Sequence, residues 1–122
     1  MTRQLVIGAA CVGLTLASGI GDSYGFIHAT QAWNGGTLVG SELARSAFGF
    51  TVGIATYWLV VRCLEALGIQ SVTVQTLGWF AVTIVGVALV SGDIARWSPI
   101  DKAIGVAVVA AVGWLLVDAG TA

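Results

Sequence analysis

The sequence predicts an all-α integral membrane protein, a four-transmembrane-helix bundle with both termini on the same side of the membrane. Of the 122 residues, 57% are hydrophobic and only 9% are charged, whereas a soluble domain carries about 25% charged residues. Four nearly uncharged stretches are each long enough to cross most of a ~30 Å hydrocarbon layer. No stretch alternates polar and apolar residues as a transmembrane barrel strand would. We therefore expect one multi-pass membrane domain over residues 1–122.

The first predicted helix covers about residues 4–33. Its beginning has the positive charge and apolar core of a signal peptide, but we interpret it as the first membrane span. The segment contains no proline, so nothing in it forces an early end. Asn34, Gly35 and Gly36 then supply a helix stop and a turn that needs positive φ.

Three further helices are predicted at about residues 41–66, 72–96 and 99–118. Turn-forming segments, LGIQS and RWSP, separate the second from the third and the third from the fourth. Ser98 is a good N-cap for the fourth helix, and Pro99 is tolerated in a first helical turn.

Charged residues gather where the predicted helices meet one membrane edge. Seven of the eleven form this polar interface cluster: Asp22, Glu42, Arg45, Asp93, Arg96, Asp101 and Lys102. Tyr24 and Trp97 beside them are typical of an interfacial aromatic belt. At this boundary Asp22 is expected to pair with Arg45. The alternative is that Asp22 is a functional acid inside the membrane.

Small residues predict close helix contacts. The set consists of Gly13, Ala17, Gly21, Gly25 and Ala29 on the first helix and Gly49 and Gly53 on the second. Helices in lipid associate through close backbone approach, which such residues permit. Small residues cover more of the first helix than one neighbour can use. We therefore expect a second contact, with another subunit or another copy of the chain.

The chain lacks the sequence patterns of common soluble enzymes and of nucleic-acid binding, and we expect no enzymatic activity. Cys11 and Cys63 have no CxxC spacing and are interpreted as small apolar residues. A net charge of −1 argues against nucleic acid as a partner. No metal site is expected, because a lone histidine needs other ligands. Basic residues are divided almost evenly between the two predicted sides, so the orientation stays open.

The leading functional hypothesis is a small non-catalytic membrane subunit. It would pack through glycine-rich helix faces into a larger assembly, with the lipid bilayer and other membrane subunits, or copies of itself, as partners. The first alternative is a small oligomeric ion channel or ion-coupled transporter that uses Asp22. The second is a protein that binds a haem- or chlorophyll-type cofactor through His28, beside which Gly25 and Ala29 would let a flat ring approach. Which cofactor, if any, stays unknown.

Overall fold

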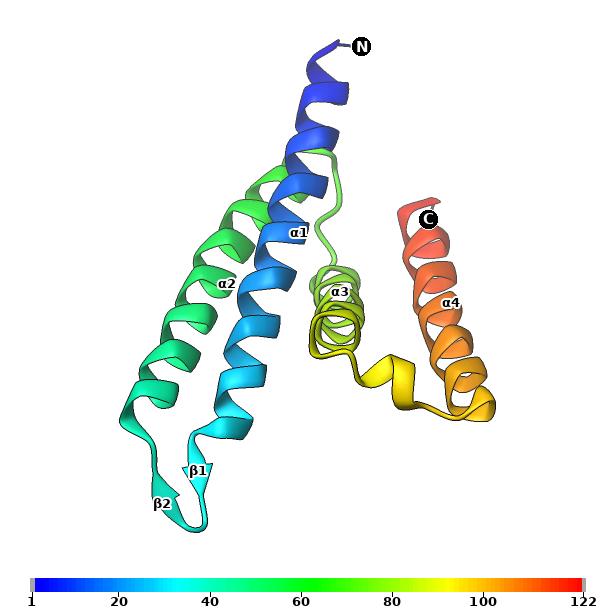
Figure 1. The fold of residues 1–122 in the computed structure, drawn as a ribbon. Helices are drawn as coiled ribbons and strands as arrows, with labels where there is room; N and C mark the ends of the chain where they lie inside the picture. The colour runs from blue at the N-terminus through cyan, green and yellow to red at the C-terminus, as the bar shows by residue number, and fades with distance from the viewer. Residues whose placement is uncertain (1, 122) are drawn as a thin grey trace.

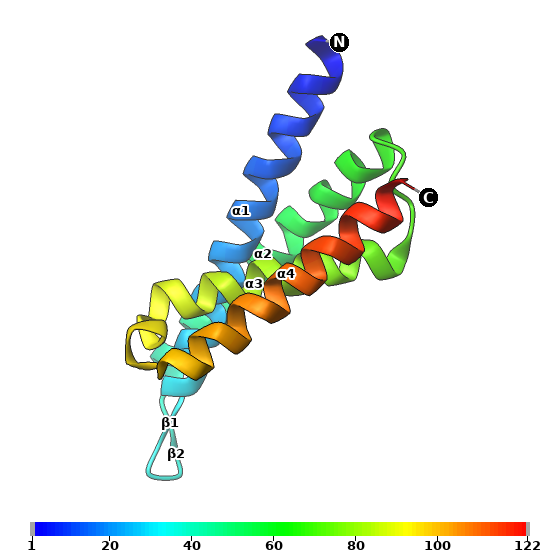
Figure 2. The same cartoon turned by 90° about the vertical axis from the view of Figure 1, so that its right-hand side faces the viewer.

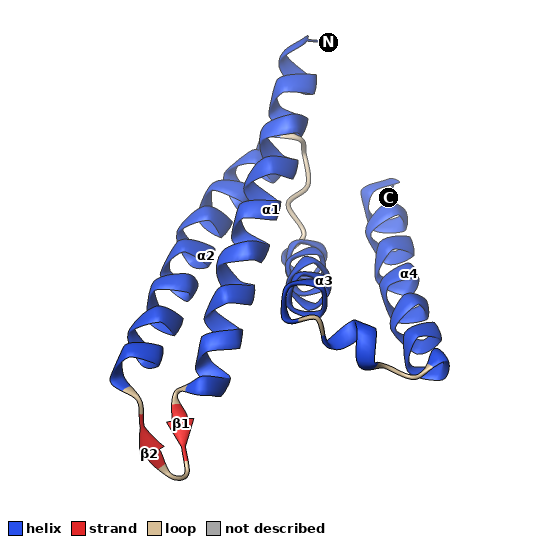
Figure 3. Cartoon of the chain, viewed as in Figure 1, coloured by secondary structure: helices blue, strands red, loops and turns tan. Residues whose placement is uncertain are grey.

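The computed structural model describes residues 2–121 and consists mainly of helices (Figures 1 and 3). The long helices are α1 (Thr2–Gln31), α2 (Gly40–Ala66), α3 (Val72–Ser91) and α4 (Pro99–Thr121). Within the described residues, α1, α2 and α3 are each long and apolar enough to cross a membrane. The predicted class is confirmed to this extent: the protein is helical and has helices that are long and apolar enough to span a membrane.

A tight hairpin joins α1 to α2. Its strands, β1 (Trp33–Asn34) and β2 (Thr37–Leu38), pair in antiparallel register around the glycine turn. Gly35 and Gly36 have φ values of 57° and 82°, which glycine adopts without strain. The turn lies where the sequence indicated, but α1 ends at Gln31 rather than near residue 33 because Trp33 enters the strand pair.

The third helix ends earlier than the sequence indicated. α3 stops at Ser91, because Gly92 adopts a left-handed conformation with φ of 75°. The chain then forms a short 3₁₀ helix, η1 (Asp93–Arg96). The expected single helix from residue 72 to residue 96 is therefore corrected to α3 followed by η1. At the start of α4, Ser98 accepts a hydrogen bond from the Asp101 amide at 3.1 Å, as an N-cap does.

The helices pack as a close hairpin with two further helices added to it. α1 and α2 lie side by side, α3 packs mainly on α1, and α4 packs on α3. α3 crosses the hairpin steeply, since it is seen nearly end-on in Figure 1, where α1 and α2 run up the page. Figure 2 shows α3 and α4 from the side.

The interior of the described chain is small and polar rather than large and apolar. The largest side chains that are fully buried are Asp22, Ser18 and Ser23. Large apolar side chains such as Phe48 and Trp58 are exposed instead. Such an arrangement suits a lipid environment, in which apolar residues face the bilayer and helices associate through small and polar residues.

Candidate functional site

Four glycines bring the backbones of α1 and α2 into close contact. A methyl group added at Gly49 would lie 2.6 Å from the Gly25 nitrogen and 2.7 Å from the Gly21 oxygen. One added at Gly21 would lie 2.8 Å from the Gly53 nitrogen. Since real side-chain carbons do not come this close to backbone atoms, only glycine fits these positions without a shift of the helices.

Asp22 is enclosed at this contact. Its exposed fraction is 1%, and its carboxylate occupies the space that a side chain at Gly53 would need. Gly53 is the midpoint of the 27-residue α2, thirteen residues from either end. The carboxylate therefore packs against the centre of α2, about 20 Å from each end of that helix.

The Asp22 carboxylate has no hydrogen bond of standard geometry. Both of its oxygens, the Trp79 indole N–H and the Thr83 hydroxyl are buried without a hydrogen-bond partner. Trp79 and Thr83, one turn apart on α3, do interact electrostatically with the carboxylate. A buried charge without good partners is costly. The arrangement of Asp22, Trp79 and Thr83, called the carboxylate site below, is therefore hard to explain as packing alone.

The neighbouring serines do not serve the carboxylate, because their hydroxyls are used elsewhere. Ser18 donates to the Gly53 carbonyl at 2.8 Å, and Ser46 donates to the Gly25 carbonyl at 2.8 Å. Ser23 donates to the Gly19 carbonyl at 2.6 Å. The first two are hydrogen bonds between α1 and α2, so these serines fasten the hairpin around Asp22.

Two cavities lie on opposite sides of Asp22 along α1. The first, of about 450 Å³, is lined by Thr15 and Ser18 of α1 and includes Trp79; we call it the Trp79 cavity. The second, of about 730 Å³, is lined by Phe26, Thr30 and Gln31 of α1 and includes Thr83; we call it the Thr83 cavity. Each cavity thus reaches one of the two donors that face the carboxylate.

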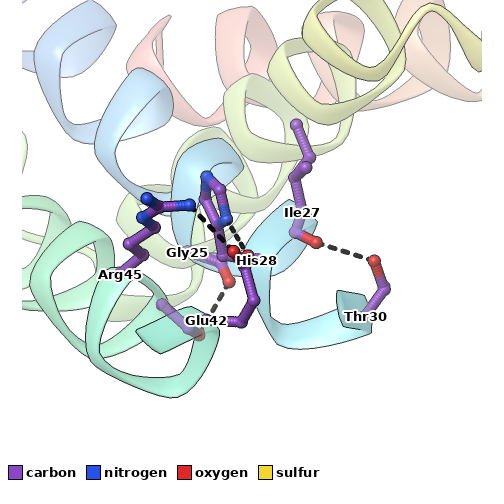
Figure 4. Close-up of polar contacts among 7 residues, drawn as sticks. Gly25, Ile27, His28, Thr30, Glu42 and Arg45 are labelled. Carbon is purple, nitrogen blue, oxygen red and sulfur yellow. Dashed lines mark hydrogen bonds and ion pairs between the residues drawn. The ribbon is translucent and has the colours of Figure 1, made fainter. Parts of the chain in front are cut away.

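A separate charged cluster joins the facing ends of α1 and α2 (Figure 4). His28 Nδ1 contacts Glu42 Oε2, and Arg45 Nη1 donates to Glu42 Oε1 at 2.8 Å. The Tyr24 ring covers His28, with ring centroids 4.2 Å apart.

The expected pairing of Asp22 with Arg45 is wrong. Arg45 bonds Glu42 instead, and neither Asp22 oxygen has a hydrogen-bond partner. The reason is distance along α2: Arg45 precedes Gly53, the residue against which Asp22 packs, by eight residues, or about 12 Å of helix.

The remaining members of the polar interface cluster lie apart from the carboxylate site. Asp93 and Arg96 are exposed on η1, and Asp101 and Lys102 are exposed in the first turn of α4. Asp101 accepts a hydrogen bond from Ser98 at 2.8 Å. In the described part of the chain no ion pair joins these four residues.

The small residues of α1 also differ in their surroundings. A methyl group at Gly25 would lie 2.8 Å from the Phe50 ring, whereas one at Gly13 would meet nothing within 4 Å. Ala17 and Ala29 are half-buried. The first half of α1 therefore presents its small residues to open space, and only the second half contacts α2 closely.

Sequence reasoning did not identify Trp79 or Thr83 as functional residues. The available signal was their spacing of four residues, which places both on one face of α3. Among the described residues, no group of three or more histidine, cysteine, aspartate or glutamate side chains could hold a metal ion.

No known protein family, no curated protein and no solved structure matches this chain.

Proposed function

We propose that this chain is a small membrane transport protein in which Asp22 binds the cation that crosses the membrane. The observation that carries the proposal is the burial of the Asp22 carboxylate without a hydrogen bond, facing two buried donors that also lack partners. An ionisable side chain in a membrane interior is expensive and usually marks an ion or substrate pathway. Transport is thus the first function to consider for such a group.

The position of Gly53 supports a deep location for this acid. Asp22 packs against the midpoint of α2, a helix of 27 residues and about 40 Å. A hydrocarbon layer of ~30 Å centred on this helix would put Asp22 well below both surfaces. We further propose that α4 forms the fourth span, which would return both termini to the same side.

We propose the two cavities as routes to the acid from both sides. The Trp79 cavity and the Thr83 cavity meet α1 on opposite sides of Asp22 and each includes one of its facing donors. A cation that enters through one cavity and leaves through the other would pass the carboxylate. The Trp79 and Thr83 side chains would have to move aside in turn, as the gates of a transporter do.

The test is cation flux in proteoliposomes. The purified chain should raise the flux of a cation, driven by an imposed H⁺, Na⁺ or K⁺ gradient and read by an entrapped indicator, above that of protein-free vesicles. Asp22→Asn keeps the size of the side chain but removes its charge, and should abolish this flux.

Glu65→Gln is the matched control, because Glu65 is an exposed acid near the end of α2, away from the carboxylate site. This variant should keep the flux. Protein that is folded and reconstituted but carries none of the three cations, or flux that survives Asp22→Asn, would refute the proposal.

A second function, that of a membrane subunit, rests on a different observation. A methyl group at Gly8 or Gly13 would meet nothing within 4 Å, and Leu5 and Val12 beside them are exposed. The first half of α1 could therefore receive a helix of another membrane protein. In this role Gly13→Leu should release a partner that co-purifies with the parent chain in mild detergent, while leaving the α1–α2 hairpin intact. Parent protein that purifies alone would exclude it.

A further inference from the structure

We propose that the cation bound at Asp22 is a proton and not Na⁺, K⁺ or a divalent metal ion. This proposal rests on the proposed function and identifies the ion that the same site takes. Its basis is the chemistry of the groups around the carboxylate, taken one helix at a time.

The site offers few oxygen atoms to a metal ion. Metal cations such as Mg²⁺ and Ca²⁺ take six or more oxygen ligands, and transporters supply backbone carbonyls for Na⁺ by interrupting their helices. α1 is continuous from Thr2 to Gln31, and α2 and α3 are likewise unbroken beside it. Carbonyls next to Asp22 therefore stay committed to the helices. The carbonyl of Gly53, the α2 residue against which Asp22 packs, already accepts from Ser18 and Thr56.

The groups that do face the carboxylate are donors. The Trp79 indole N–H can donate a hydrogen bond but cannot coordinate a cation, and the Thr83 hydroxyl can donate to the ionised carboxylate or accept from the protonated acid. Two donors suit an ionised carboxylate. When a proton binds, the acid becomes neutral and its burial costs far less. The site thus accommodates both protonation states, whereas a metal ion would be held beside an N–H that repels it.

Among the residues that the structure describes, those placed against Asp22 by α2 and α3 carry no charge. The facing residue on α2 is Gly53, and those on α3 are Trp79 and Thr83. Tyr57 of α2 is a titratable residue on that side, and its ring packs on Trp79 with centroids 5.5 Å apart. His28 of α1 is held by Glu42. A proton is therefore the one cation that neutralises Asp22 without further ligands.

The test is labelling with dicyclohexylcarbodiimide, an apolar reagent that enters membranes and reacts with protonated carboxyl groups. The acid adds across one C=N bond of the reagent, and its proton goes to the nitrogen. The acyl group then migrates from oxygen to nitrogen, so that the whole reagent stays attached and nothing leaves. Mass spectrometry of peptides from the reconstituted chain should find the label on Asp22, and the labelling rate should fall as the pH rises from mildly acidic to mildly alkaline.

Added metal ions and two tryptophan variants make this test more specific. Na⁺, K⁺ or Mg²⁺, added at constant pH and ionic strength, should not protect Asp22. Trp79→Phe removes one donor that faces the carboxylate and should increase labelling at a fixed alkaline pH by up to about tenfold, if this N–H donates to the acid in its ionised form. Trp58→Phe is the matched control, because Trp58 is 70% exposed on α2, and it should leave the rate unchanged.

Each outcome separates the two proposals. Protection by a metal ion, a rate that does not vary with pH, or the absence of label on Asp22 would overturn the assignment of the proton. If the flux experiment still shows a cation current that depends on Asp22, the transport function survives that result. Conversely, pH-dependent labelling without any flux would retain a protonating Asp22 but refute transport.

Discussion

The Asp22 carboxylate is buried because Gly53 has no side chain. Any larger residue at this position would occupy the space that holds the carboxylate oxygens. The carboxylate site therefore requires Gly53, although this residue carries no functional group. Its role can be tested separately from the chemistry of the acid.

We predict that Gly53→Ala displaces the Asp22 side chain, abolishes cation flux and destabilises the protein by about 1–3 kcal/mol, the usual cost of overpacking. Thermal unfolding in detergent, together with the flux assay, measures both effects. Gly13→Ala is the control, since a methyl group there meets nothing within 4 Å. It should be neutral or stabilise the helix by up to ~1 kcal/mol. Equal stability of the two variants would contradict the close contact between α1 and α2.

The individual helices follow from local signals in the sequence, whereas the carboxylate site does not. Apolar runs indicated the spans, and Ser98, Pro99 and the Asn34–Gly36 turn marked helix ends close to where they lie. Gly92 could also have been read as a stop, but the predicted helix was extended to residue 96.

The site depends on the register in which α1 and α2 pack along each other. Counting charges from the helix ends put Asp22 level with Arg45. The hairpin instead fits Gly21 against Gly49 and Gly53, which moves Asp22 towards the middle of α2. No local rule fixes this register, because it arises from interlocking backbones that are about 30 residues apart in the chain. Trp79 and Thr83 come from a third helix, whose placement is still harder to foresee.

Gly92 lets the chain turn between α3 and η1, and we expect this turn to position α4. Its φ of 75° is unfavourable for any residue with a side chain. Gly92→Ala should therefore lower the free energy of unfolding by about 1–2 kcal/mol, measured by thermal unfolding in detergent. Gly8→Ala, a helical glycine with open space around it, should show no loss. A Gly92→Ala protein as stable as the parent would mean that the left-handed turn is absent in the membrane.

Contacts are distributed unevenly over the whole molecule, since α1 is held by both α2 and α3 while α4 packs on α3. Local opening follows this distribution, because segments with few buried contacts open most easily. We predict that amide hydrogen exchange in detergent is slowest in the second half of α1 and fastest, among the four long helices, in α4. Strong protection of α4 in the isolated protein would instead indicate a contact that another copy provides.

The steep crossing of α3 over the hairpin also determines how the molecule can sit in a bilayer. No single membrane normal can run parallel to both α3 and the hairpin (Figures 1 and 2). With 20 residues, α3 is about 30 Å long, so it matches the hydrocarbon thickness only when it stands nearly upright. The longer α1 and α2 can absorb the tilt, since a helix of about 40 Å crosses a ~30 Å layer at roughly 40° from the normal. In a thicker bilayer the hairpin would then tilt less from the membrane normal, which changes its angle to α3. The thickness of the surrounding lipid would thus exert a force on the helix crossing that encloses Asp22.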